Sequence, residues 1–148
     1  MPRPYLAVLF DLDGTLTTVA SLWRHLHESL EQWHGNADDY QERFLQGAID
    51  YNTFCLLDAR HWKGKRVGEL KKIADAVELR PGVRELREFL RKRGLKVGVI
   101  STGLTLLTDR IAAEFGVDYA VANRLLTADG LFTGGVEIVV PHDGKGNE

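Results

Sequence analysis

The chain of 148 residues is poor in cysteine, because Cys55 is its only one. A single cysteine forms neither an intrachain disulfide nor a Cys-x-x-Cys zinc or redox site, so disulfide scaffolds and such metal centres are excluded. This cysteine content favours a reducing compartment, the cytoplasm. Cys55 stands among apolar neighbours, and we expect it to be a small buried residue rather than a nucleophile.

An excess of charge of one sign is also lacking. Lys and Arg total 19, Asp and Glu total 21, and the formal net charge is −2. Nucleic-acid binding requires a basic surface, so no nucleic-acid partner is expected. No apolar run approaches the roughly 20 residues that span a bilayer. The apolar stretch before the first carboxylates is too short for a signal peptide, so no membrane partner is expected either.

What the chain does contain is typical of a packed domain, with 44% hydrophobic and 27% charged residues. Two apolar runs, 5–10 and 96–100, end at polar loops and predict buried parallel strands. Shorter runs further along predict a strand, a hairpin turning at 128–130, and a last strand. These later strands are expected at 119–122, 124–127, 131–133 and 136–140.

Apolar residues recur at helical spacing in six segments. Five of these helices are expected between the first two strands, a block of four around 22–33, 40–45, 54–62 and 67–77 and then one around 83–90. The sixth is expected after the second strand, around 104–115. Gly35 is expected to close the first helix, Asp50 to cap the third, and Gly116 to end the sixth. Strands alternating with helices predict an α/β fold with a parallel sheet. The long first connection predicts a separate helical lobe over about residues 18–80.

Two polar motifs directly follow the first two strands, at the sheet edge where ligands bind in such folds. Asp11 and Asp13 are expected to face the same side, and two carboxylates this close need a cation or proton between them. Gly14 permits a tight turn that exposes backbone N–H groups, and we expect it to be one of the phosphate-binding residues. Opposite, Ser101, Thr102 and Gly103 precede a helix, where a hydroxyl and backbone amides form an anion site suited to phosphate.

Carboxylates, a divalent cation and a phosphate site together indicate phosphoryl transfer. One aspartate can act as nucleophile and form an aspartyl-phosphate. The other can serve as general acid and then as base. Mg²⁺ would offset the repulsion between carboxylate and phosphoryl oxygens, and a lysine would neutralise developing charge. Lys145 is the only lysine after Lys96.

The motifs DLDGTLT and STG, each behind a strand, resemble those of the haloacid dehalogenase superfamily. The stretch GVDYAVANRLLTADGLFTGGV, with GKG after it, is similar to the phosphoserine phosphatase branch. The resemblance implies a Rossmann-like core of residues 1–17 and 81–148 with a helical cap, residues 18–80, inserted after the first motif. It also implies specific roles for the motif residues. Asp11 is the nucleophile, Asp13 the acid–base, Asp11 and the Asp13 carbonyl the Mg²⁺ ligands, and Ser101, Thr102, Gly103 and Lys145 the phosphate holders.

The sequence departs from that family pattern in two places. The family carries a later acidic GDGxxD-type motif that completes the Mg²⁺ site, whereas this sequence ends at Glu148. We therefore expect a core truncated at its C-terminus, weak Mg²⁺ binding, little turnover, and an exposed sheet edge that promotes a homodimer. Ala20 stands where phosphoserine-specific members carry an acid, so phosphoserine is not expected to be markedly preferred.

The leading hypothesis is a Mg²⁺-dependent phosphatase that hydrolyses a small phosphorylated metabolite. Phosphotransfer to another hydroxyl remains an alternative, as does a catalytically impaired or non-catalytic chain that only binds phosphate. The presence of Asp11, Asp13 and Ser101 favours chemistry, and the missing last motif argues against it. The three tryptophans are expected to pack within the helical lobe, and the five histidines to lie at the surface or in the cap.

Overall fold

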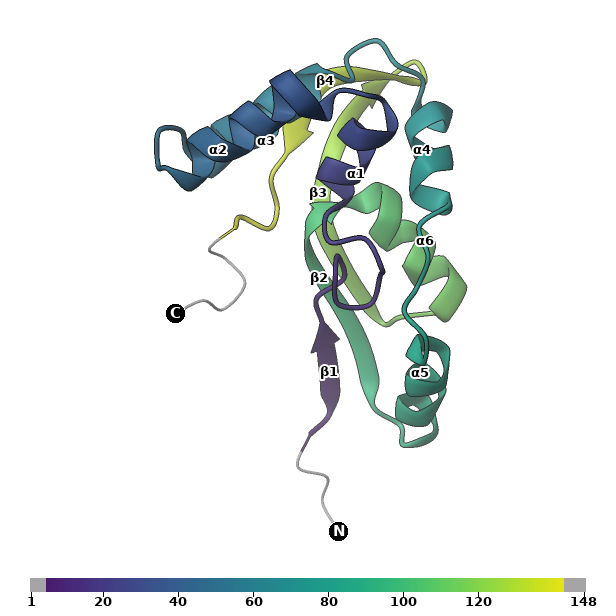
Figure 1. The fold of residues 1–148 in the computed structure, drawn as a ribbon. Coiled ribbons are helices and arrows are strands. Elements are labelled where there is room, and N and C mark those ends of the chain that lie inside the picture. The colour runs from purple at the N-terminus through teal and green to yellow at the C-terminus, as the bar shows by residue number, and fades with distance from the viewer. Residues whose placement is uncertain (1–4, 143–148) are drawn as a thin grey trace.

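The computed structural model describes residues 5–142, which form a four-stranded sheet with helices packed along it (Figure 1). The strand order is β1–β2–β3–β4; the first two neighbouring pairs are parallel and the last pair is an antiparallel hairpin. This arrangement confirms the predicted α/β fold with a parallel Rossmann-like sheet and a β-hairpin. The strands are β1 (Ala7–Phe10), β2 (Lys96–Leu104), β3 (Tyr119–Ala128) and β4 (Leu131–Glu137).

Five α-helices and one short π-helical turn lie between β1 and β2, and a sixth α-helix follows β2. No helix between residues 5 and 142 combines the length and the apolar character needed to cross a membrane. The helical elements are α1 (Leu22–Ser29), η1 (Trp33–Ala37), α2 (Asp38–Leu45), α3 (Tyr51–Arg60), α4 (Val67–Asp75), α5 (Val83–Lys92) and α6 (Thr105–Phe115).

Local capping explains several helix boundaries. The Asp50 side chain accepts a hydrogen bond of 2.7 Å from the Thr53 amide, which confirms it as the N-cap of α3. Gly116 takes a left-handed conformation with φ of 59° and ends α6 as predicted. The first helix is shorter than predicted. It ends at Ser29, because Glu31 adopts a left-handed φ of 58° that a helix cannot continue through.

Three predicted strand boundaries are wrong. β2 does not stop before Ser101 but continues to Leu104, since its pairing with β3 resumes there after a register shift beyond Ile100. The strands predicted at 119–122 and 124–127 are one strand, β3, whose first part pairs with β2 and whose second part pairs with β4. The predicted strand at 136–140 contributes only its first two residues, which complete β4.

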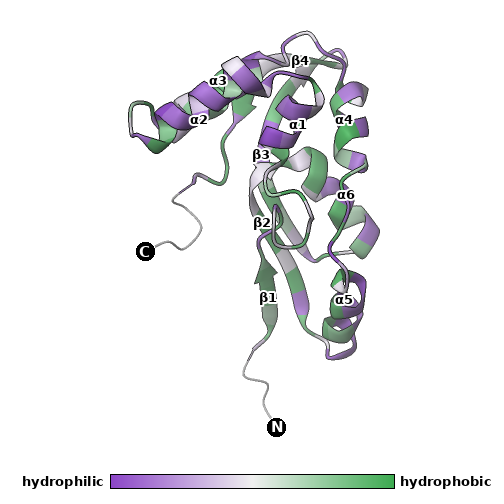
Figure 2. Cartoon of the chain, in the orientation of Figure 1, coloured by the Kyte–Doolittle hydropathy of each residue, from purple (hydrophilic) through white to green (hydrophobic). Residues whose placement is uncertain are grey.

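The two faces of the sheet differ in their cover. Helices α4, α5 and α6 lie along one face, and Figure 2 shows hydrophobic residues along β1 and much of β2. On the other face Leu9, Gly98 and Tyr119 form one cross-strand row, in which Leu9 is 60% and Tyr119 57% exposed. A Cβ on Gly98 would lie 2.5 Å from a Leu9 methyl carbon, so a larger residue there would displace the exposed Leu9 side chain.

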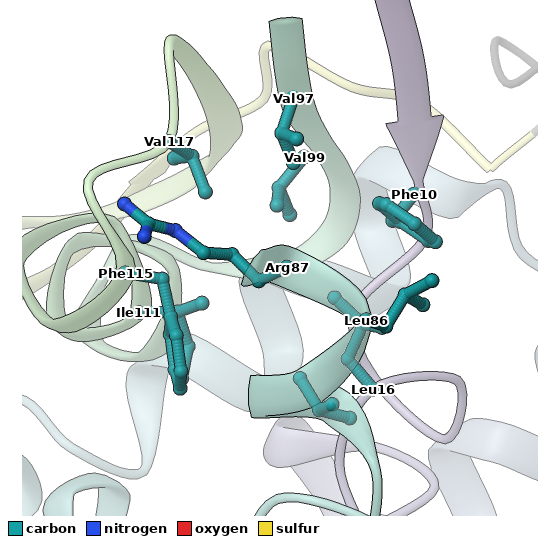
Figure 3. A pocket seen from close by; sticks show the side chains of 10 residues that line it. Phe10, Leu16, Leu86, Arg87, Val97, Val99, Ile111, Phe115 and Val117 are labelled. Atoms are coloured by element: carbon teal, nitrogen blue, oxygen red, sulfur yellow. The ribbon is translucent and has the colours of Figure 1, made fainter. Parts of the chain in front are cut away.

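A small apolar pocket lies under α5, between that helix, the sheet and α6 (Figure 3). Its volume is about 30 Å³, and Phe10, Val99 and Phe115 are among its lining residues. Ligand pockets are usually at least about ten times larger. The pocket therefore belongs to the packing of the helix-covered face, and neither aspartate of the first motif lines it.

Candidate active site

The loop that follows β1 meets the C-terminal part of β2 through a side-chain contact. Ser101 Oγ donates a hydrogen bond of 3.2 Å to Asp13 Oδ1, across 88 positions of sequence. The contact forms because parallel neighbouring strands end at the same sheet edge. Ser101 is fully buried and Asp13 is half-buried. The structure thus brings together one residue from each of the two predicted motifs.

The Asp13 carboxylate is also held by the first helix of the β1–β2 connection. Its Oδ2 accepts a hydrogen bond of 2.8 Å from the backbone amide of Leu22, the first residue of α1. The amides at a helix N-terminus carry partial positive charge and stabilise a carboxylate there. α1 therefore helps to fix the position of the Asp13 carboxylate.

Gly103 lies so close to Asp13 that no other residue fits. A Cβ built on Gly103 would be 2.7 and 2.8 Å from the two Asp13 carboxylate oxygens. The Gly103 amide donates a hydrogen bond of 2.9 Å to Ser101 Oγ, so this amide and this hydroxyl both lie beside the Asp13 carboxylate. The structure accordingly gathers Asp13, Ser101 and Gly103 into one polar cluster.

Asp11 follows β1 directly and is half-buried. Its Oδ1 accepts a hydrogen bond of 2.9 Å from the Leu12 amide, and its Oδ2 accepts one of 3.2 Å from the Thr15 hydroxyl. Mg²⁺ prefers oxygen ligands and is commonly held by one or two carboxylates together with phosphate oxygens and water. The Asp11 carboxylate and the Asp13 main-chain carbonyl are chemically suited to that role. Residues 5–142 contain no cluster of three or more His, Cys, Asp or Glu side chains able to hold a metal.

Gly14 shapes the turn after Asp13. Its φ is +75°, and a Cβ would lie 3.2 Å from the Ala20 Cα, so the turn favours glycine on both counts. Its amide donates to Thr17 Oγ1 at 3.1 Å, and its carbonyl accepts from Arg80 at 3.0 Å. The Gly14 amide was predicted to face phosphate, but here it bonds within its own turn.

Thr102 presents its carbonyl to side chains from three other elements. Trp23 of α1, Tyr51 of α3 and Asn123 of β3 all donate hydrogen bonds to this oxygen. Tyr51 and Asn123 had not been singled out from the sequence, and Trp23 was expected only to pack. A buried, polar Asn in the middle of an apolar strand was the available signal for Asn123. Lys145 lies outside the described residues.

Comparison with known proteins shows the same organisation elsewhere. Residues 5–137 match the family model described as haloacid dehalogenase-like hydrolase. A phosphoserine phosphatase from Archaeoglobus fulgidus is 32% identical over 133 residues, covering 88% of this chain and 37% of that protein. A phosphoserine phosphatase from Streptococcus thermophilus is 35% identical over 95 residues, covering 64% of this chain and 44% of that protein.

Solved structures show the same similarity. A phospho-aspartyl intermediate analogue of phosphoserine phosphatase superposes with a TM-score of 0.77 at 25% identity, covering 94% of this chain and 66% of that one. The chain thus spans less than two thirds of these relatives. Because the family model covers most of its length and the motif residues lie together, the chain belongs to the haloacid dehalogenase-like hydrolases, in the branch that resembles phosphoserine phosphatase.

Proposed function

We propose that the chain is a Mg²⁺-dependent phosphomonoester hydrolase that works through an aspartyl-phosphate intermediate. The observation that carries this proposal is the contact between Ser101 and Asp13, which joins the two motifs at one sheet edge. Asp11 precedes Asp13 by two residues in the same loop. A nucleophile, an acid–base and phosphate-binding groups are the parts that such a reaction needs.

In the first step, a carboxylate oxygen of Asp11 attacks phosphorus while the bond to the leaving oxygen breaks. Asp13 gives its proton to that leaving oxygen and becomes a carboxylate. In the second step a water molecule attacks the phosphoryl group, Asp13 takes a proton from it, and the bond to Asp11 breaks to release inorganic phosphate. The Ser101 hydroxyl and the Thr102 and Gly103 amides hold phosphoryl oxygens, and Lys145 is proposed as their cationic partner. Mg²⁺, bound by Asp11 and the Asp13 carbonyl, would supply charge compensation.

Replacing Asp11 by Asn tests the covalent step. The change removes the nucleophile with almost no change in shape, so we expect turnover of p-nitrophenyl phosphate in Mg²⁺ to disappear. Asp109→Asn, at an exposed position on α6, serves as the matched control and is expected to keep full activity. An Asp11→Asn variant that keeps wild-type activity would rule out the aspartyl-phosphate. Thermal unfolding of both variants checks that the fold is retained.

A small phosphorylated metabolite is the proposed substrate, without strong preference for phosphoserine. The relatives named above are phosphoserine phosphatases, but Ala20, which lies against Gly14 in the site loop, carries no charge to bind an ammonium group. A panel of phosphomonoesters with wild type and Ala20→Glu tests this. We expect Ala20→Glu to raise kcat/KM for phosphoserine relative to the other esters. Wild type preferring phosphoserine at least tenfold would contradict the proposal.

A phosphate-binding chain with impaired turnover is the second candidate. It is favoured by the finding that residues 5–142 contain no group of three or more His, Cys, Asp or Glu side chains able to hold a metal ion. The same assay distinguishes the two candidates, because this one predicts inorganic phosphate binding by the wild type with turnover near background at all Mg²⁺ concentrations.

Two further features belong to the proposal. Residues 18–80 are proposed to act as a cap over the site, supported by the contact of the Leu22 amide with Asp13.

A homodimer is proposed because β1 is an end strand of the described sheet and Leu9 is largely exposed. Sedimentation of wild type and Leu9→Lys tests the dimer, which the charged residue should dissociate. A cytoplasmic location stays a prediction from the cysteine content.

A further inference from the structure

The carbonyl oxygen of Thr102 accepts hydrogen bonds from three side chains on three elements. The donors are Trp23 Nε1 at 3.1 Å, the Tyr51 hydroxyl at 3.2 Å and Asn123 Nδ2 at 3.0 Å. A carbonyl oxygen has two lone pairs, so three donors saturate it. The register shift in β2 between Ile100 and Leu104 takes this stretch out of the regular ladder, which makes the carbonyl accessible to side chains.

The opposite side of the same peptide unit faces the candidate active site. In a planar trans peptide the C=O of Thr102 and the N–H of Gly103 point in opposite directions. The Gly103 amide donates to Ser101 Oγ, which in turn donates to Asp13 Oδ1. The hydrogen bonds that hold the Thr102 carbonyl therefore also set the direction of the Gly103 amide at the site.

The three donors are held firmly. Asn123 is fully buried, and its Oδ1 accepts hydrogen bonds of 2.8 Å from the amides of Val139 and Val140 while Nδ2 also reaches the Val140 carbonyl. Trp23 is 9% exposed. Burial raises the pKa of Tyr51 far above neutral pH, so its hydroxyl stays protonated and able to donate.

We propose that Trp23 and Tyr51 are positioning residues that couple the β1–β2 helices to phosphate binding. Both come from that helical segment, α1 and α3, whereas Asn123 comes from the sheet. With both donors in place, the Gly103 amide is oriented to bind a phosphoryl oxygen; without them, the peptide unit can rotate. This inference rests on the proposed role of Ser101, Thr102 and Gly103 in phosphate binding.

Two conservative substitutions test the clamp, meaning the hydrogen bonds from Trp23 and Tyr51 to the Thr102 carbonyl. Trp23→Phe and Tyr51→Phe each remove one donor and keep an aromatic ring in place. Inorganic phosphate affinity is measured by calorimetric titration of the 148-residue chain, and hydrogen exchange of the Gly103 amide is followed by two-dimensional NMR. Each variant is expected to bind phosphate about two- to tenfold more weakly, the loss typical of one hydrogen bond. The double variant should lose more than either, with faster exchange at Gly103.

Matched controls separate positioning from general packing. Trp33→Phe changes another buried indole, and Tyr40→Phe removes a hydroxyl that bonds the His61 ring. These controls are expected to keep wild-type phosphate affinity and Gly103 exchange. Equal affinity losses in controls and clamp variants would overturn the inference, as would unchanged affinity in the double variant. If the wild type binds no phosphate, the proposed function fails. Gly103 exchange then tests the positioning role separately. Faster exchange in the double clamp variant, and not in the controls, would support that role, and unchanged exchange would overturn it.

Discussion

Asp13 and Asp58 are both removed from full solvent exposure and both accept a hydrogen bond from a residue far along the chain, but their surroundings differ. Asp13 lies at the sheet edge, is half-buried, and is held by a hydroxyl and a backbone amide. Asp58 lies in α3, is 3% exposed, and contacts the ring nitrogen Nε2 of His27 at 2.9 Å. The Asp13 carboxylate is partly exposed to solvent, whereas Asp58 is closed off by packing.

The His27–Asp58 pair is enclosed by aromatic side chains. The Trp62 ring stacks on His27 with ring centroids 4.6 Å apart, and His61 meets it edge-on at 5.4 Å. Burial raises the pKa of Asp58, and the hydrogen bond from His27 opposes that rise. Among buried side-chain nitrogen and oxygen atoms of residues 5–142, His27 Nδ1 is the one without a hydrogen-bond partner.

The two carboxylates have different roles because their surroundings differ. Asp13 accepts hydrogen bonds from a hydroxyl and a backbone amide and is only half-buried, so it can exchange protons with a substrate. Asp58 is sealed from water next to an imidazole, so its contribution is to the packing and stability of the helices around it. Changes at Asp13 should therefore alter rate, and changes at Asp58 should alter stability.

Asp13→Asn should produce the largest effect. General acid–base catalysis commonly contributes roughly 10²- to 10⁴-fold, so we expect kcat to fall by that factor. The fold should persist, because an Asn side chain can accept from the Leu22 amide and donate to Ser101 Oγ. Steady-state hydrolysis of an alkyl phosphate, whose leaving oxygen needs a proton, measures the loss. An unchanged kcat with that ester would contradict the role of Asp13, and a large fall in melting temperature would erase its contrast with Asp58.

Asp58→Ala should cost stability instead. Removing one partner of a buried pair leaves His27 without its hydrogen bond, and we expect a loss of about 3 kcal/mol in the free energy of unfolding. The higher helix propensity of Ala offsets only a small part of that loss. Urea unfolding followed by circular dichroism measures the change. Asp39→Ala, which removes an exposed ion pair with Arg43, is the matched control and should stay within about 1 kcal/mol of wild type. Equal losses in the two variants would remove the distinction between buried and exposed carboxylates.

The sequence predicted the parts of the molecule that local pattern determines. The strand after Tyr5, the helices α2 to α6 and the loop bearing Asp11 follow from apolar periodicity and from the residues that end each element. The continuous strand β3 was missed because its polar Asn123 interrupts the apolar pattern, whereas the structure satisfies that side chain with hydrogen bonds from distant segments.

The buried position of His27 was not evident from the sequence either. Its neighbours at helical spacing resemble those of a half-exposed residue, and its partner Asp58 lies 31 positions away on another helix. Contacts between distant residues depend on how helices pack, which periodicity within one helix does not report. The same holds for Tyr51, whose partner in β2 is 51 positions away.

The smallest expected effect concerns His61, whose ring lies beside that of His27 in the buried His27–Asp58 pair. Its Nε2 forms a hydrogen bond of 3.0 Å with the Tyr40 hydroxyl. Burial lowers the pKa of His61 from its ordinary value of 6.5, and His27 lowers it further while Asp58 opposes the shift. The unfolded chain thus takes up a proton at higher pH than the folded chain, so His61 reduces stability as pH falls through 6.5. The raised pKa of Asp58 acts in the opposite sense, because its contribution to stability is lost as pH rises through the folded value.

His61→Asn should therefore flatten the loss of stability on mild acidification. We expect the free energy of unfolding to fall less in the variant than in wild type between about pH 7.5 and about pH 5.5, since one group with a lowered pKa has been removed. Tyr40→Phe keeps the imidazole and should retain the wild-type slope, which separates titration of the ring from loss of its contact with Tyr40. Urea unfolding at several pH values measures the slopes. Parallel curves for wild type and His61→Asn would show that His61 does not titrate differently in the folded chain, which would contradict this prediction.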